Sequence, residues 1–214
     1  MKGDRGWIVY KTEVPEALAV GAQGPGTLKE FDALMADLKA RGIYTIGRIV
    51  TFKDNILANA RPDLAIIDTR TNKPWIDNEK LAWVDPFREE VWKYNVAIAR
   101  EAAKRGFDEI QFDYVRFPTD GKLGAAKYAH PNNKETRLPA IAGFLGMARR
   151  ELGPLGRLRR RRRLRLHRLQ RERHGHRPAH RGAGAASRLL LPDGLPLRVP
   201  GGYPWIPQPR PAPV

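Results

Sequence analysis

The first three quarters of the chain alternate between two patterns of apolar residues. One pattern has the helical period of about 3.6 residues and predicts helices over about 28–41, 86–105 and 139–152. The other is a run of β-branched and aromatic residues, which predicts strands at 43–51 and 107–117. Because 43–51 is apolar on both alternating faces, we expect it to be buried on both sides.

Local signals mark the ends of these elements. Thr27 stands three residues before Glu30, the spacing of a capping box at a helix start. Gly42, Gly106 and Gly153 follow the three helical patterns, where glycine allows a left-handed stop. Each predicted strand therefore follows its helix with almost no loop.

The order helix, strand, helix, strand, helix determines the expected fold class. Such alternation is typical of parallel strands joined by right-handed helical crossovers, hence of an α/β sheet or barrel. Two full strands are too few to complete either, and a (β/α)8 TIM barrel typically needs about 250 residues. The sequence predicts a partial TIM barrel.

Composition divides the chain near residue 155. The chain has 214 residues and a formal net charge of +16, a value that suggests nucleic acid or an anionic membrane surface. The segment 156–214, called the tail, holds 15 Arg, two acidic residues and no Lys, Asn, Thr, Phe or Met. The tail thus carries +13, and the body, residues 1–155, carries only +3.

Absent residue types exclude several classes of protein. The chain has no cysteine, which excludes a disulfide scaffold, a thiolate metal site and a cysteine nucleophile. No run reaches the 18 or so apolar residues of a membrane helix, and the N-terminus lacks the apolar core of a signal peptide. Nothing in the sequence indicates a metal or another cofactor. The tail, rich in Arg and Pro, is expected to be disordered.

Candidate chemistry lies where the two predicted strands end, since functional groups gather at the carboxyl ends of parallel strands. Gln111, Asp113 and Arg116 lie within six residues at the end of the second strand. Asp113 is either a nucleophile or base, or merely a helix cap or ion-pair partner. His130 lies in a loop, where we expect no role for it.

The first strand also ends in polar residues. Arg48, Lys53 and Asp54 lie at or just after its apolar run. The pair Lys53 and Asp54 suits a solvated cap at a helix start as well as a binding site. Trp75 and Trp83 are expected either to stack on sugar rings or to fill core and rim positions. These patterns by themselves establish an α/β domain and no particular reaction.

Three segments of the body resemble a known family. They are RIVTFKD at 48–54, WVDP at 83–86 and the long run GFDEIQFDYVRFP at 106–118. Across the body, the sequence closely resembles a bacterial glycoside hydrolase domain family, TIM-barrel proteins similar to α-amylase-type hydrolases. The resemblance implies hydrolysis of the O-glycosyl bonds of a poly- or oligosaccharide by a pair of carboxylates, without a cofactor.

The resemblance also assigns roles to the matching residues. Asp113 matches the strand-end carboxylate proposed as catalytic nucleophile in amylase-like barrels. Lys2 belongs to a segment that resembles the end of a first strand, which implies that the start of the barrel is missing and that Met1 is an internal methionine. The resemblance implies substrate-binding or carboxylate-orienting roles for Lys2, Arg48, Lys53, Asp54, Gln111 and Arg116.

The tail departs from the family, and its codons suggest why. When the reading frame is shifted by one base, the codons for three parts of the tail can encode other sequences. These are DVFGYT for residues 162–167, NENDTGIGQ for 170–178 and DYFCPMVYPS for 188–197. All three strings match motifs that the family carries in this order. We therefore expect the tail to be an out-of-frame translation, caused by a frameshift in the gene or an error in its sequence.

Two expectations follow for activity and partners. The second catalytic carboxylate would be the aspartate of the DVFG motif, which Arg162 replaces, so this chain is expected to be an inactive fragment of a hydrolase. The resemblance implies an extracellular or cell-envelope location for the parent protein. The alternative is an α/β module whose Arg-rich arm binds nucleic acid. We expect a carbohydrate substrate and no specific nucleic-acid partner, because shifted codons explain the Arg positions better.

Overall fold

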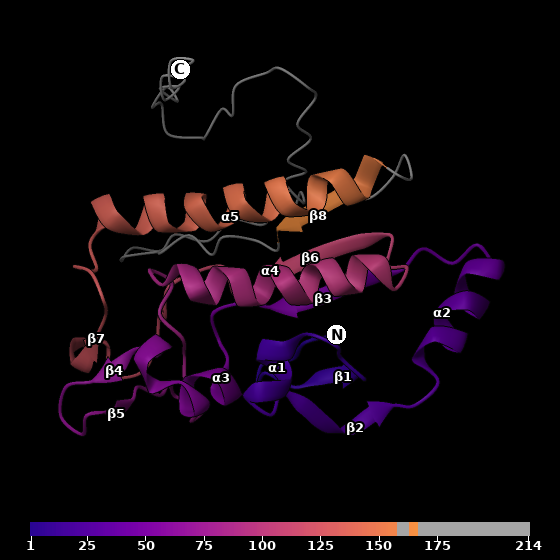
Figure 1. Ribbon diagram of the computed structural model, residues 1–214. Helices are drawn as coiled ribbons and strands as arrows, with labels where there is room; N and C mark the ends of the chain where they lie inside the picture. Colours follow the sequence, from indigo (N-terminus) through magenta and orange to yellow (C-terminus); the bar gives the residue numbers. More distant parts are fainter. Residues whose placement is uncertain (158–162, 167–214) are drawn as a thin grey trace, which may run out of the picture. The chain divides into compact units, whose positions relative to one another are not determined.

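The computed structural model describes residues 1–157 and 163–166 as a mixed α/β unit (Figure 1). Its centre is a parallel sheet in the order β3-β6-β8, formed by Ile46–Val50, Glu109–Asp113 and Arg163–Leu166. Most of the predicted tail lies outside the described residues. No helix in the described part is long and apolar enough to cross a membrane.

Strands β3 and β6 run parallel, in register from the Ile46–Glu109 pair to the Val50–Asp113 pair. On the other side of β3, Lys2 makes a parallel bridge to Ile49, and its backbone N–H donates to the carbonyl of Arg48. The N-terminal segment thus lies beside β3 as a strand end would. The parallel arrangement predicted from the sequence is confirmed for these segments.

A small excursion precedes the first predicted helix. Strands β1 (Ile8–Tyr10) and β2 (Gln23–Leu28) pair in parallel, and the short helix α1 (Pro15–Ala19) joins them. No sequence pattern predicted these elements, because β1 and α1 are too short to show a period and β2 consists mostly of Gly, Pro and polar residues. Thr27 therefore belongs to β2, and its hydroxyl lies against the carbonyl of Gly24. The predicted capping box is wrong.

The helix expected over 28–41 is α2 (Phe31–Ala40), three residues shorter at its start. Its predicted stop is confirmed, since Gly42 has a φ of +67°. The strand expected over 43–51 is wrong at its start: Ile43 is 47% exposed and precedes β3. The preceding helix ends at residue 40, and the chain needs several residues before it can join the sheet.

A second excursion separates β3 from the next long helix. It contains two short helical segments, two two-residue strands and several isolated bridges, and it pairs with a third short strand from beyond β6. The elements between β3 and that helix are α3 (Asn55–Ala60), η1 (Pro62–Leu64), β4 (Ile67–Asp68) and β5 (Lys73–Pro74). The third short strand is β7 (Ala126–Lys127), which follows the helical turn η2 (Leu123–Ala125) beyond β6. The excursion lies at the carboxyl ends of β3 and β6.

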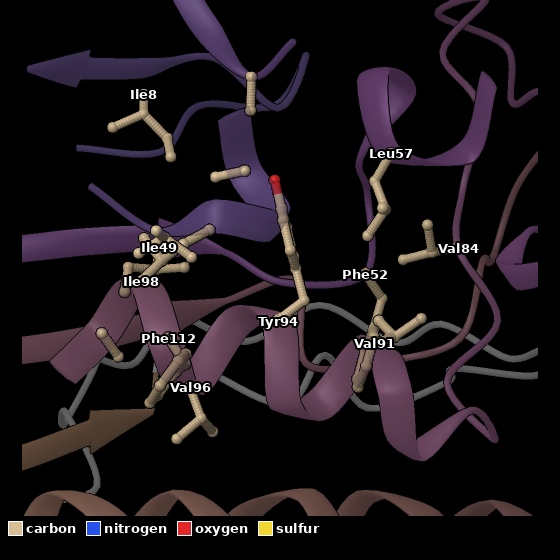
Figure 2. Packing of buried hydrophobic residues seen from close by; sticks show 14 of the residues in the cluster. Ile8, Ile49, Phe52, Leu57, Val84, Val91, Tyr94, Val96, Ile98 and Phe112 are labelled. Carbon is tan, nitrogen blue, oxygen red and sulfur yellow. The ribbon is translucent and has the colours of Figure 1, made fainter. Parts of the chain in front are cut away.

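Helices α4 (Glu89–Lys104) and α5 (Lys134–Arg157) run alongside one another on one side of the sheet (Figure 1). Ile49 of β3, Phe112 of β6 and Ile98 of α4 are fully buried between the sheet and α4, as Figure 2 shows. Helix α4 begins three residues after the predicted start at residue 86, but the helical period predicted for it is confirmed, since Val91, Tyr94, Ile98 and Ala102 are all buried.

Helix α5 is longer at both ends than the predicted 139–152. Gly153 does not end it, and Pro139 and Pro154 both lie inside it. Gly143 has a specific packing role, because a Cβ atom there would lie 2.7 Å from the indole ring of Trp92 on α4. The two helices are close at this point, and only a glycine leaves room for the indole.

One buried charge holds the N-terminal segment in place. The Lys2 ammonium is fully buried, 2.7 Å from the Asp54 carboxylate and 2.8 Å from both the Val50 carbonyl and the Asn95 side chain. It also lies over the ring of Tyr94, which projects from α4 in Figure 2. Burial lowers the pKa of Lys2, and the neighbouring Asp54 carboxylate offsets part of that effect.

Replacing Lys2 tests how much this pair contributes. We expect Lys2→Met to lower the free energy of unfolding by about 3 kcal/mol, because Asp54 is left as an uncompensated buried charge. Urea denaturation followed by circular dichroism measures it. The control is Arg41→Met, which breaks an exposed pair with Asp37 and should change the value by about 0.5 kcal/mol or less. Equal effects of the two variants would contradict the structure.

The helix contact gives a second stability prediction. Gly143→Ala should cost about 1–3 kcal/mol, because the added methyl group displaces the Trp92 indole. Gly146→Ala is the matched control in the same helix, where the nearest atom is the flexible end of Arg150 at 3.4 Å. That change should stabilise by about 0.5–1 kcal/mol through helix propensity. Thermal melts measure both effects. A shift of the melting temperature in the same direction for both variants would contradict the close contact.

Candidate functional site

Three parallel segments bring charged side chains together at one end of the sheet. Arg48 of β3 holds Asp113 of β6, with its Nε and Nη2 atoms 2.8 and 2.6 Å from Asp113 Oδ2. The same guanidinium lies 3.4 Å from Asp4, which follows Lys2 in the N-terminal segment. Arg48 is 43% exposed and Asp113 is 18% exposed, so the group faces solvent.

The backbone turns sharply directly after Asp113. Tyr114 has a φ of +51°, a left-handed conformation that is uncommon for a bulky residue. Its N–H donates to Asp113 Oδ1 at 2.8 Å, so both carboxylate oxygens of Asp113 have a donor. Such strained residues cluster at functional sites and cost about 1–3 kcal/mol each. The turn orients the carboxylate at the strand end.

A second charged cluster lies beyond β3. The Lys53 ammonium contacts Asp77 at 2.9 Å and Glu79 at 2.8 Å, and the Trp83 indole donates to Asp77 at 3.0 Å. Lys53 and Asp77 are each 1% exposed, whereas Glu79 is 62% exposed. The chain between β3 and α4 folds back here, and Lys53 bridges to Trp83 through its backbone.

Tyr114 stands between the two clusters. The Lys53 ammonium lies 5.3 Å from the centre of its ring, and the Arg116 guanidinium lies 5.1 Å from it. Arg116 also lies 5.4 Å from the Trp83 ring and donates to the Thr119 hydroxyl at 2.8 Å. Of the predicted set, Lys53 and Arg116 thus lie against the Tyr114 ring, and Asp113, held by Arg48, accepts from the backbone N–H of the same residue.

The other predicted residues lie elsewhere or have another role. Lys2 and Asp54 are fully buried between the sheet and α4, on the side away from Asp113. Asp54 also caps α3 by accepting from the N–H of Leu57, so the helix-cap interpretation is confirmed, although the cap is buried rather than solvated. Gln111 is half-buried on the Asp113 face of β6. Arg162 lies outside the described residues.

Charge pairing changes the acid–base properties of the second cluster. Burial acts to lower the pKa of Lys53, but its hydrogen bonds to the Glu79 and Asp77 carboxylates outweigh that effect and raise the pKa above its ordinary value. Burial acts to raise the pKa of Asp77, but the Trp83 indole and the Lys53 ammonium lower it below its ordinary value. Both groups are therefore held in their charged forms.

Burial also acts on Arg48, where it tends to lower the pKa. The hydrogen bond and charge of Asp113, with a smaller contribution from Asp4, raise it instead. Among the described residues, no group of acidic or histidine side chains could hold a metal ion. A surface depression of about 420 Å³ lies apart from these clusters, lined by Phe87, Trp92, His130 and the start of α5.

The chain has one clear match among sequence families. Residues 1–158 match the family model described as "Putative glycosyl hydrolase domain". The chain belongs to this family. None of the curated proteins matches it.

Several solved structures are similar to this chain. A hypothetical protein from Ruminiclostridium thermocellum is 34% identical, with a TM-score of 0.63, over 71% of this chain and 75% of that one. An α-galactosidase from Thermus thermophilus in complex with stachyose is 18% identical, with a TM-score of 0.46, over 63% of this chain and 29% of its own. A GH31 dextranase from Flavobacterium johnsoniae complexed with glucose is 13% identical, with a TM-score of 0.46, over 64% and 19%.

The structure decides between the two interpretations of the tryptophans in this domain. Trp75 is 1% exposed and Trp83 is fully buried, so both pack in the core and neither presents a face to a sugar. The sequence analysis did not single out Asp4, Asp77 or Glu79. Asp4 lies two residues after Lys2 in the segment assigned to a strand end, and that position was the available signal.

The buried pair in the glycosyl hydrolase domain predicts a pH-dependent contribution to stability. Because the folded pKa of Asp77 lies below its ordinary 3.8, the contribution is full above pH 3.8 and is lost as the pH falls through the lowered value. Asp77→Asn should therefore cost about 2 kcal/mol at neutral pH, and less in acid. Urea titrations at a series of pH values measure the difference. A constant difference at every pH would contradict the assignment.

Proposed function

We propose that Asp113 is the catalytic nucleophile of a glycoside hydrolase and that the parent protein is a TIM barrel cleaving poly- or oligosaccharides. The observation that carries the proposal is a half-exposed Arg48 guanidinium holding a strand-end carboxylate. Membership of the glycosyl hydrolase domain family supports the same reaction class.

The geometry suits a carboxylate that attacks while ionised. Arg48 donates two short, charge-assisted hydrogen bonds to Oδ2, and the strained Tyr114 peptide donates to Oδ1. These donors fix the orientation of Asp113 and leave part of it exposed. An attacking carboxylate needs such preorganisation because it must meet the anomeric carbon in line with the breaking bond.

The neighbouring residues supply binding groups that differ in their exposure to solvent. Arg116 and Gln111 are half-buried on either side of Asp113 in sequence and are suited to donate to sugar hydroxyls. The Lys53 ammonium is ion-paired with two acidic residues, so it does not contact the substrate itself. It orients Glu79, whose exposed carboxylate is the group that contacts the substrate. Lys2 and Asp54 support the same strand ends from within the core.

The 214-residue chain is proposed to be a fragment with little or no steady-state activity. Its tail has the composition of an out-of-frame translation, and the family match ends at residue 158. Substrate affinity comes from many strand-end loops in barrel enzymes, and the body supplies only some of them. Resequencing the gene across codons 150–160 tests the frameshift, and an intact frame through the Arg-rich run would refute it.

Replacing the proposed nucleophile tests the function. In the frame-restored protein, we expect hydrolysis of α-galactoside or α-glucoside oligosaccharides, measured as reducing ends released. Asp113→Asn should lower kcat at least about 10³-fold, because the amide cannot form the glycosyl-enzyme bond. Asp37→Asn, at an exposed position on α2, is the matched control and should leave kcat unchanged. Full activity of the Asp113→Asn variant would contradict the proposal that Asp113 is the nucleophile.

A further inference from the structure

Asp4 lies opposite Asp113 across one guanidinium group. Asp4 Oδ1 is 3.4 Å from Arg48 Nη2, and Asp113 Oδ2 is 2.6 Å from the same nitrogen. These two oxygens can therefore be no farther apart than the sum of the two distances, about 6 Å. The three side chains come from three adjacent parallel segments at the same end of the sheet.

A cation is needed for two carboxylates to lie this close, since like charges in a partly buried site repel each other. Arg48 supplies that cation, but it does not serve the two acids equally. Its contacts with Asp113 are 2.6 and 2.8 Å, whereas its contacts with Asp4 are 3.4 and 3.5 Å. Asp4 is also more exposed, at 37% against 18%.

We propose that Asp4 is the second carboxylate of the site, the residue that protonates the leaving group. The inference rests on the proposed function of Asp113, because it assigns the partner in the same reaction. Two carboxylates in different environments divide the roles of ion and proton carrier. Asp113 has the shorter contacts with Arg48, whereas Asp4 has the longer contacts and the greater exposure to solvent, where it can meet the leaving group.

The separation indicates the stereochemical course. Carboxyl groups about 5–5.5 Å apart serve retaining hydrolases, whereas about 6.5–9.5 Å is needed to place a water molecule in inverting ones. An upper limit of about 6 Å between the nearest oxygens agrees with retention. The acidic residues of the second cluster are less suitable, since Asp77 and Glu79 both contact Lys53 rather than Arg48.

The reaction then has two balanced steps. Asp113 attacks the anomeric carbon, the glycosidic C–O bond breaks, and its electron pair stays on the leaving oxygen, which takes the proton from Asp4. A water molecule next attacks the same carbon and gives a proton to the Asp4 carboxylate, and the bond to Asp113 breaks. Both side chains return to their starting states, and one water molecule is consumed.

Leaving-group dependence separates a proton donor from a merely structural residue. The frame-restored protein, in excess, is incubated with phenyl and dinitrophenyl glycosides of galactose and glucose, and phenol release is followed in a single turnover. Dinitrophenolate departs without a proton, whereas phenolate needs one. Asp4→Asn should slow release from the phenyl glycosides by about 10²-fold or more and from the dinitrophenyl glycosides by roughly threefold or less.

Further variants and a label complete the test. Asp4→Glu should restore part of the phenyl rate, Asp4→Ser should repeat the selective loss, and Asp37→Asn should change neither rate. Equal slowing of both substrates in Asp4→Asn and Asp4→Ser, or no slowing at all, would overturn the role of Asp4. A 2-deoxy-2-fluoro dinitrophenyl glycoside should label Asp113 in the frame-restored protein without substitutions, detected by peptide mass spectrometry. Absence of that label would instead overturn the proposed function itself.

Discussion

The parallel pairing of β3 with β6 is the constraint on which the site depends. Its register places Arg48 beside Gln111 and Val50 beside Asp113, so a cation and a carboxylate emerge from neighbouring strands at the same end. The N-terminal segment joins the same sheet at Ile49. Because parallel strands present their carboxyl ends together, groups distant in sequence become one site without any special loop.

Three cations that differ in their degree of burial stabilise this end of the sheet. The ammonium group of Lys2 is fully buried and joins the N-terminal segment to α4, and that of Lys53 is buried against acidic partners from the following excursion. Of these three cations, Arg48 is the well exposed one, and it contacts two carboxylates. Buried pairs of this kind are costly to break, whereas a half-exposed guanidinium can exchange partners with a substrate. Burial thus separates the charges of Lys2 and Lys53 from that of Arg48, the cation of the proposed active site.

Sequence patterns predicted the elements that are long and periodic. The stripe on α4 contains enough turns to define a face, and β6 is apolar enough to be recognised inside 107–117. Short elements such as β1 and α3 were missed, because three to six residues contain less than two periods. The start of α2 was misplaced for a different reason: Thr27 has a hydrogen bond within β2, and tertiary pairing outweighed the local capping signal.

The sequence by itself determined the family and the α/β class and singled out Asp113 and Arg48 as candidate site residues, because residue types and helical periods are local properties. Only the tertiary structure decided which charges face solvent. It buried Lys2 and Asp54, enclosed Trp83, and brought Asp4 to the Arg48 guanidinium across 44 positions of the chain. Burial and side-chain distance depend on how separate segments pack, and no local pattern encodes that packing.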